Sequence, residues 1–183
     1  YVSVLPADAM DENGDGERLG HTVGGAQVPP GATAVTVEVN PEPLPYAQIT
    51  MFIFDDSSPT NGGVNANERG LGGFQITLED AGGRYGISAG AMSQDADGNP
   101  LTNALDCFGG TAPPPGIILS CPDLDPDPDV VSPLAGQVLI KNLWPAKYGI
   151  IATPPNASDW VQTSTIEGTK VIDAWVKAGE PPF

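Results

Sequence analysis

The sequence predicts an all-β protein built as an antiparallel β-sandwich with long loops, and three observations support this fold class. Apolar and polar residues alternate in several short runs, as in strands with one buried face. The 183 residues include 23 Gly and 20 Pro spread along the whole length, which disfavours long helices. Gly, Pro, Asn or Asp bounds each alternating run, as expected where turns join consecutive strands.

The alternating runs define six predicted strands, at residues 32–40, 46–56, 73–80, 136–143, 147–155 and 160–166. In the second of these, Ile49, Met51 and Ile53 fall on one face. Residues 169–179 (TKVIDAWVKAG) fit either a further strand or one to two helical turns. Residues 92–135 have little periodicity, and a loop of that length usually has a function or needs additional stabilisation.

A weak internal similarity bears on domain organisation. Residues 1–6 followed by 21–28 resemble residues 148–154 followed by 162–171, because in both a Tyr-led strand ends at Pro and a Thr-rich, Gly-containing strand then precedes Val. If this is a repeat, residues 1–45 are an N-terminal β segment that forms the tail of a preceding module. Residues 46–166 are then the sandwich domain, and 167–183 a C-terminal strand or linker segment. Chance similarity between two β segments is the alternative.

The charge of the chain restricts its partners. Seven Lys and Arg against 23 Asp and Glu give a net charge of −16. A polyanion repels phosphate backbones and anionic lipid, so we expect no nucleic-acid binding. No apolar run approaches the roughly 20 residues that a membrane-spanning helix needs, so we expect no membrane insertion.

The two cysteines, Cys107 and Cys121, lie in a Gly- and Pro-rich stretch. A disulfide between them would close a loop of about 14 residues and contribute roughly 3 kcal/mol in the chain-entropy model. Two free buried thiols are the alternative. The sequence has no CxxC pair and one His, which argues against a zinc site. The disulfide implies an oxidising compartment, so we expect a secreted, extracellular or cell-surface protein.

The most specific motif is the polar run at residues 54–74, FDDSSPTNGGVNANERGLGGF, which joins two predicted strands. Calcium takes six to eight oxygen ligands from carboxylates, amides and backbone carbonyls. The run supplies such oxygens within 14 positions, and its glycines could turn a backbone carbonyl inward. The candidate ligands are Asp55, Asp56, Asn61, the Val64 carbonyl, Asn65 and Glu68. A solvated polar turn is the alternative.

The same run resembles the B-repeats of bacterial serine-aspartate-repeat surface proteins, which are relatives of the collagen-adhesin B-type domain. The matching positions are Phe54-x-Asp56, Asn61-Gly62, Asn65, Glu68, Gly70-Leu71 and Gly73. Residues 136–155 also look like a strand pair of that family. The resemblance covers roughly residues 46–165. It implies a prealbumin-like, Ig-like Greek-key sandwich of seven strands with Ca²⁺ between the first two, serving as a stalk, filament or surface spacer.

The sequence departs from the family pattern in ways that affect the ligand set. One extra residue between Asp56 and Asn61 leaves open whether Asp55, Asp56, Ser58 or Thr60 faces the metal. Asn65 replaces the commoner Asp and lowers the charge of the ligand set.

Other acidic runs offer weaker cation sites. A second candidate loop has the D-x-N-x-D-G start of a calcium loop but lacks its final Glu, so an acidic hairpin tip is the alternative. Its residues are Asp11, Asn13, Asp15 and Glu17. The run from Asp123 to Asp129 is interpreted as an extended linker, and residues 95–100 as a turn.

We expect no enzymatic activity. His21 is the one imidazole, and the chain has no GxSxG nucleophile motif, phosphate loop or dinucleotide fingerprint. The expected function is that of an extracellular, calcium-stabilised structural or adhesive module, whose partners are neighbouring modules or copies of itself. The alternative is a module that binds a surface glycan or protein through late aromatic residues, Trp144, Tyr148, Trp160 and Trp175. Packing in the core is the other interpretation of these rings.

Overall fold

A computed structural model of the chain describes residues 1–4, 24–39, 46–82, 90–127, 129–156, 159–165 and 169–177. In these ranges the protein is all-β and has no helix, and every strand pair is antiparallel. The predicted fold class is therefore confirmed at the level of an antiparallel all-β protein. No helix with the length and apolar composition needed to cross a bilayer occurs in the described ranges.

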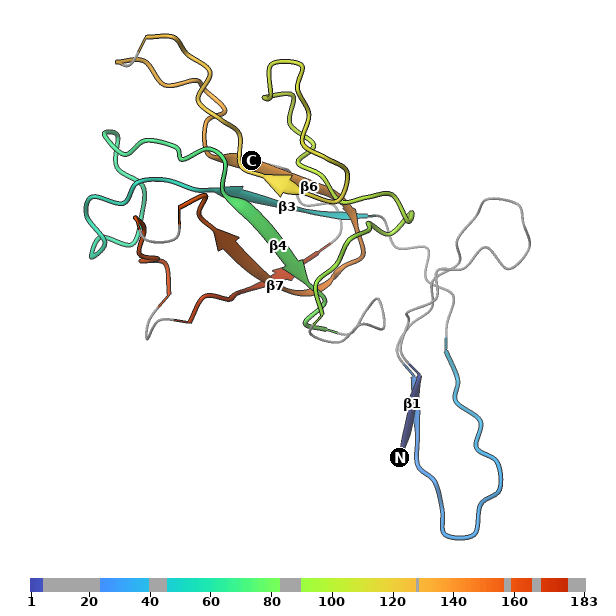
Figure 1. Cartoon of the computed structure of the whole chain (residues 1–183). Coiled ribbons are helices and arrows are strands. Elements are labelled where there is room, and N and C mark those ends of the chain that lie inside the picture. The colour runs from blue at the N-terminus through green and yellow to red at the C-terminus, as the bar shows by residue number, and fades with distance from the viewer. Residues whose placement is uncertain are drawn as a thin grey trace.

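The strands form three sheets (Figure 1). One is the short hairpin of β1 and β2, the second pairs β3 with β6, and the third has the order β5-β4-β7-β8. The bounds are β1 (Val2–Val4), β2 (Gly24–Ala26), β3 (Ala47–Phe52), β4 (Gln75–Glu79), β5 (Ile118–Leu119), β6 (Gln137–Leu143), β7 (Ala146–Thr153) and β8 (Ile172–Val176). Figure 1 shows the β1–β2 hairpin lying apart from the other two sheets, which we call the body (residues 46–177).

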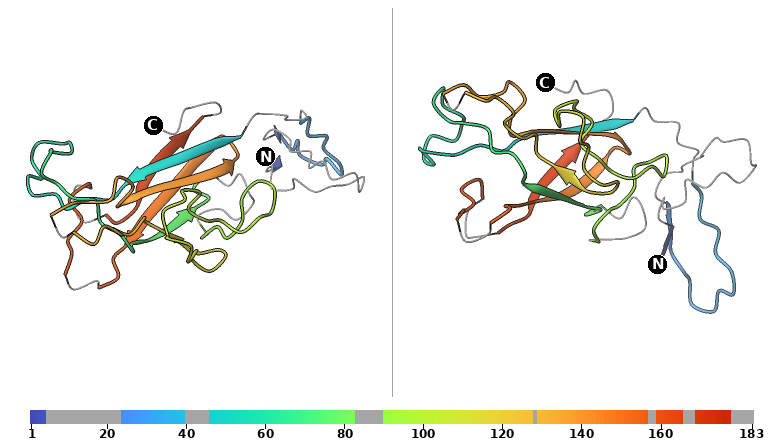
Figure 2. Two further views of the ribbon diagram at one scale, coloured as in Figure 1. Left: turned by 90° about the horizontal axis from the view of Figure 1, so that it is seen from above. Right: turned by 45° about the horizontal axis from the view of Figure 1, so that its top comes forward.

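The hydrophobic core of the body takes side chains from both of its sheets. Ile49 of β3 and Ile140 of β6 belong to the same cluster of buried residues as Leu78 of β4 and Ile150 of β7. Figure 2 shows the β3–β6 pair lying over the four-stranded sheet. Tyr148 is fully buried in this cluster, and its hydroxyl donates to the Trp144 carbonyl. Alternation along each strand puts the apolar residues on the inner face.

Two glycines allow the loops of the body to cross at one point. The Ile53 N–H donates to the Gly136 carbonyl at 2.9 Å, and the Leu71 N–H donates to the Ile53 carbonyl at 2.7 Å. A Cβ on Gly70 would lie 2.0 Å from the Ala135 carbonyl oxygen, and one on Gly136 would lie 2.2 Å from the Ile53 oxygen. No side chain fits at either position, so the crossing requires glycine at both.

Most of the predicted strands are present, with two exceptions. The runs at 46–56, 73–80, 136–143 and 147–155 contain β3, β4, β6 and β7, and the ambiguous run at 169–179 contains strand β8. Residues 32–39 and 160–165 are not strands, so the predictions of strands there are wrong within the described residues. A β-type sequence becomes a strand only when a partner strand supplies the ladder hydrogen bonds, and neither segment has one.

Candidate functional site

The predicted ligand loop leaves the β3 edge and returns to it. At its base Phe54 and Gly70 form an isolated antiparallel bridge, and the Asp55 N–H donates to the Arg69 carbonyl at 2.9 Å. The loop, residues 55–68, is therefore closed by backbone hydrogen bonds between its two ends.

Glu68 organises the interior of the 55–68 loop. Its side chain is only 9% exposed. Oε1 accepts from the N–H and the hydroxyl of Ser57 at 3.0 and 3.2 Å, and Oε2 accepts from the Asn65 N–H at 2.7 Å. The Asn65 N–H contributes most to lowering the Glu68 pKa, burial acts in the opposite direction, and the Ser57 donors lower it further. The carboxylate therefore stays ionised and holds both sides of the loop together.

The remaining candidate ligands form local turns. Asp56 Oδ1 accepts from the Ser58 N–H at 3.0 Å, and Oδ2 accepts from the Thr163 hydroxyl at 2.6 Å. Asn61 Oδ1 accepts from the Gly63 N–H at 3.1 Å, which is an Asx turn at the exposed tip of the loop. These bonds account for the Asp and Asn residues of the loop in the absence of a cation.

The structure brings together only part of the predicted ligand set. Asn65 and Glu68 lie side by side, with Nδ2 3.4 Å from Oε1, and Asp56 is linked to them through the adjacent Ser57. Asn61 and the half-exposed Val64 lie at the loop tip. In the ranges that the structure describes, no three His, Cys, Asp or Glu side chains are grouped to hold a metal. The second candidate set, Asp11, Asn13, Asp15 and Glu17, lies outside the described residues.

The oxygen donors of the loop are nevertheless of the kind that calcium prefers. Asp55, Asp56, Asn65 and Glu68 offer carboxylate and amide oxygens, and each carboxylate oxygen has lone pairs beyond those used by its present donors. A cation would bind through these and would compete with the Ser57 and Asn65 donors for Glu68.

The acidic run from Asp123 to Asp129 folds back on itself, so its interpretation as an extended linker is wrong. Asp123 Oδ1 accepts from the N–H and hydroxyl of Ser132 at 2.9 and 2.8 Å, and these donors lower the Asp123 pKa. The Asp125 N–H adds a bond at 3.2 Å. Repulsion along the run is offset because each carboxylate accepts from a backbone N–H two residues further on, as far as Asp129.

Residues 95–100 form the turn that the sequence predicts. Asp95, which is 9% exposed, accepts from the N–H groups of Asp97 and Asn99 at 2.9 and 2.8 Å. Gly98 has a φ of 77°, which glycine adopts without strain. Asn142 of β6 also donates to Asp95 at 3.3 Å, so the turn is attached to the sheet.

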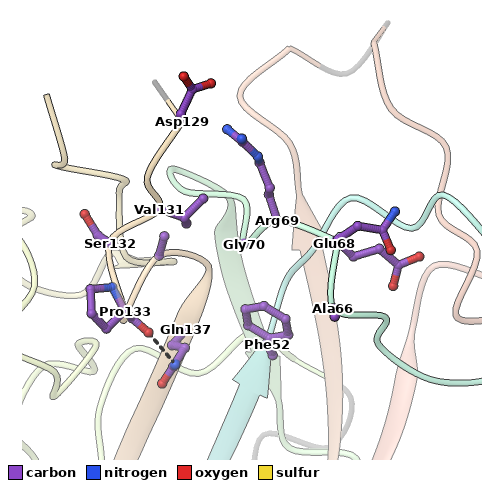
Figure 3. Close-up of a pocket in the computed structure, with 12 residues that line it drawn as sticks. Phe52, Ala66, Glu68, Arg69, Gly70, Asp129, Val131, Ser132, Pro133 and Gln137 are labelled. Carbon is purple, nitrogen blue, oxygen red and sulfur yellow. Dashed lines mark hydrogen bonds between the residues drawn. The ribbon is translucent and has the colours of Figure 1, made fainter. Parts of the chain in front are cut away.

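A surface cavity of about 510 Å³ lies beside the 55–68 loop (Figure 3). Phe52, 37% exposed at the end of β3, lines it together with Arg69 on one side and Ser132 and Gln137 on the other. Phe52 also stacks on Phe54 with ring centroids 5.5 Å apart. Sequence reasoning missed this cavity, although the outward position of Phe52 in an alternating strand was a signal for it.

The late aromatic residues do not share one exposed face. Trp144 is 5% exposed and Tyr148 is fully buried, so the interpretation of these two rings as ligand-stacking residues is corrected to core packing. Trp160 packs edge-on against Phe74 at 5.7 Å. Trp175 is exposed on β8, with Lys147 Nζ 5.7 Å from its ring centroid.

The predicted disulfide between Cys107 and Cys121 is present, with a Cα–Cα distance of 5.6 Å, and Cys121 is fully buried. Asn103 reinforces the same segment. Its Nδ2 donates to the carbonyls of Leu119 and Gln137 at 2.9 and 3.0 Å, and its Oδ1 accepts from the Leu139 N–H at 3.0 Å. The long aperiodic segment is therefore attached to β5 and β6, and its disulfide indicates an oxidising environment.

Comparison of the chain with protein-family models, with curated proteins and with solved structures finds no match.

Proposed function

We propose that the chain is an extracellular structural module, a prealbumin-like β-sandwich with Ig-like Greek-key connections that serves as a spacer or assembly unit of a bacterial surface protein, stalk or filament. The core shared by the β3–β6 pair and the four-stranded sheet supports the sandwich architecture. The resemblance of residues 46–165 to serine-aspartate-repeat B-repeats supports the surface location, as does the disulfide.

The observation that carries this proposal is the attachment of every long described loop to the body. Glu68 closes the 55–68 loop, Asp95 fixes the 95–100 turn to β6, and Asn103 with the disulfide fixes the following segment. Rigid loops give a module a fixed shape, which a spacer under load needs. The ionisable and amide side chains of these loops are used to hold backbone rather than directed together into a reactive cleft.

We further propose that Ca²⁺ binds the 55–68 loop and stiffens it. The loop places two adjacent carboxylates, Asp55 and Asp56, in the same short excursion as Glu68, in a chain of net charge −16. A divalent cation would offset their mutual repulsion. Since it would bind the folded loop alone, it would raise the thermal midpoint of unfolding (Tm) by mass action.

Calorimetry of the full chain in excess EDTA and in excess Ca²⁺ tests this proposal. Saturation at about 100 times Kd contributes about 2.7 kcal/mol, which corresponds to a rise in Tm of about 5–11 °C for a chain of this length. The double variant Asp56→Asn/Glu68→Gln should lose the rise. The double variant Asp125→Asn/Asp127→Asn removes the same charge from the other acidic loop and should keep it.

An equal Tm in EDTA and Ca²⁺ would exclude calcium stabilisation. An equal loss of the rise in both double variants would show a general charge effect instead of a site in the 55–68 loop.

A further inference from the structure

The β1–β2 hairpin and the β7–β8 hairpin are built alike. Both are antiparallel pairs, and their connections have similar lengths, 19 residues (5–23) and 18 residues (154–171). These are unusually long hairpin connections. In the sequence, a Tyr lies at or near the start of each first strand, and a Pro follows its end.

The two hairpins also share an apolar face. Val2 lies opposite Ala26 and Val4 opposite Gly24, and opposite residues of an antiparallel pair project from the same face. Alternation adds Val28 to this face and places Ser3 on the other. In β7–β8 the corresponding face carries Ile150, Ala174 and Val176, all of which contact the core of the body.

The hairpins differ in what covers them. Ile150 and Val176 are 6% and 8% exposed, whereas Val2 and Val28 are 45% and 39% exposed. Residues 37–39 approach Gly24 and cover that end of the β1–β2 face. The second edge of β7 pairs with β4 over five residues, whereas in the described ranges β1 pairs with β2 alone.

We propose that the face of Val2, Val4, Ala26 and Val28, together with the free edge of β1, is a docking surface for a second body of the same construction. There β1 would take the place of β7 beside a strand of the β4 type, and Val2 would occupy the place of Ile150. The inference rests on the proposed function as an assembly unit.

The occupant is a body because two features must be satisfied together, an apolar face and an adjacent strand edge. In this chain the core and β4 provide exactly that combination for β7–β8, and β4 already carries its own β7. The partner is therefore a body without its own terminal hairpin, as neighbouring units of a tandem array would provide. A short peptide would satisfy the edge and leave the apolar face exposed.

Hydrogen exchange on an extended chain tests the docking. Residues 46–148 are joined directly to Tyr1 of the full chain, which places Val2 in the position of Ile150 of the added body. Opening of a docked strand requires local unfolding. The amides of residues 2–4 and 24–26 should exchange at least about tenfold more slowly in the extended chain than in the original one.

Two matched controls identify the surface. Joining residues 46–147 to Tyr1 shifts the register by one residue and turns the apolar face outward, so protection should be lost. In the first extended chain, Val2→Asp should abolish protection, whereas Ser3→Asp on the opposite face should retain most of it.

Equal exchange in the original and extended chains, whether or not the added body folds, overturns the docking proposal. So does equal protection in the two registers. Because the readout uses no calcium, protection together with an unchanged Tm in EDTA would retain the docking surface and reject the calcium site.

Discussion

The 55–68 loop and the 101–121 segment meet the same requirement by different chemistry. Each carries backbone away from the strands and must find partners for its N–H and carbonyl groups. The first uses one carboxylate, Glu68, at the surface. The second uses a disulfide and the neutral amide of Asn103, which is 8% exposed. The comparison shows that one loop depends on pH and ions, whereas the other depends on redox state.

Removing the disulfide should have the largest effect. The double variant Cys107→Ser/Cys121→Ser should lose about 3 kcal/mol of unfolding free energy, because a loop of about 14 residues is released in the unfolded chain. The Tm should fall by about 6–12 °C. Calorimetry with and without reductant checks this, and reductant should lower the Tm of the unmodified protein but leave the variant unchanged. A protein shown by mass to be reduced, with its Tm intact, would contradict the redox half of the comparison.

Asn103→Ala should come next, with a loss of about 2–3 kcal/mol, because the buried Leu139 N–H and two carbonyls lose their partner. Urea titration gives the free energy directly. The matched control is Asn61→Ala at the exposed loop tip, where one Asx bond is lost and the change should stay within about 0.5 kcal/mol. Similar losses at the two sites would show that burial of the amide is not what matters.

Glu68→Gln should have the smallest effect and the clearest pH dependence. The folded-state pKa lies below the usual value of 4.5, so the stabilisation is fully present above that value and is lost as the pH falls through the folded pKa. The Tm difference between the protein and the variant, measured in EDTA, should be greatest at neutral pH and should close under acid conditions. Glu38→Gln, outside the body, is the control. A constant difference at all pH values would assign the effect to the shape of the side chain.

The sequence predicted the strands of the body because their alternation is strong and their boundaries are marked. It also predicted the disulfide, since two cysteines in an aperiodic segment have one pairing. It could not predict the absence of a strand at 32–39, because strand formation depends on a distant partner. Strand β5 is only two residues long and has no periodicity to detect.

The candidate site was predictable as a set of residues but not as a geometry. The spacing of Asp56, Asn65 and Glu68 correctly indicated a single polar loop. It did not reveal that Glu68 would accept from Ser57 and Asn65, because a carboxylate binds backbone N–H groups and cations through the same oxygens. The burial of Trp144 and Tyr148 depends on how the two sheets meet, which composition does not specify.

The contact between Gly70 and Gly136 has a consequence for how this architecture can diversify. Because the excursions on either side are anchored where these residues meet, their tips can lengthen or shorten without moving the strands beneath. Variation is thus confined to the periphery while the junction itself admits no substitution. Related chains should accordingly differ most in outline and least at this pair of positions.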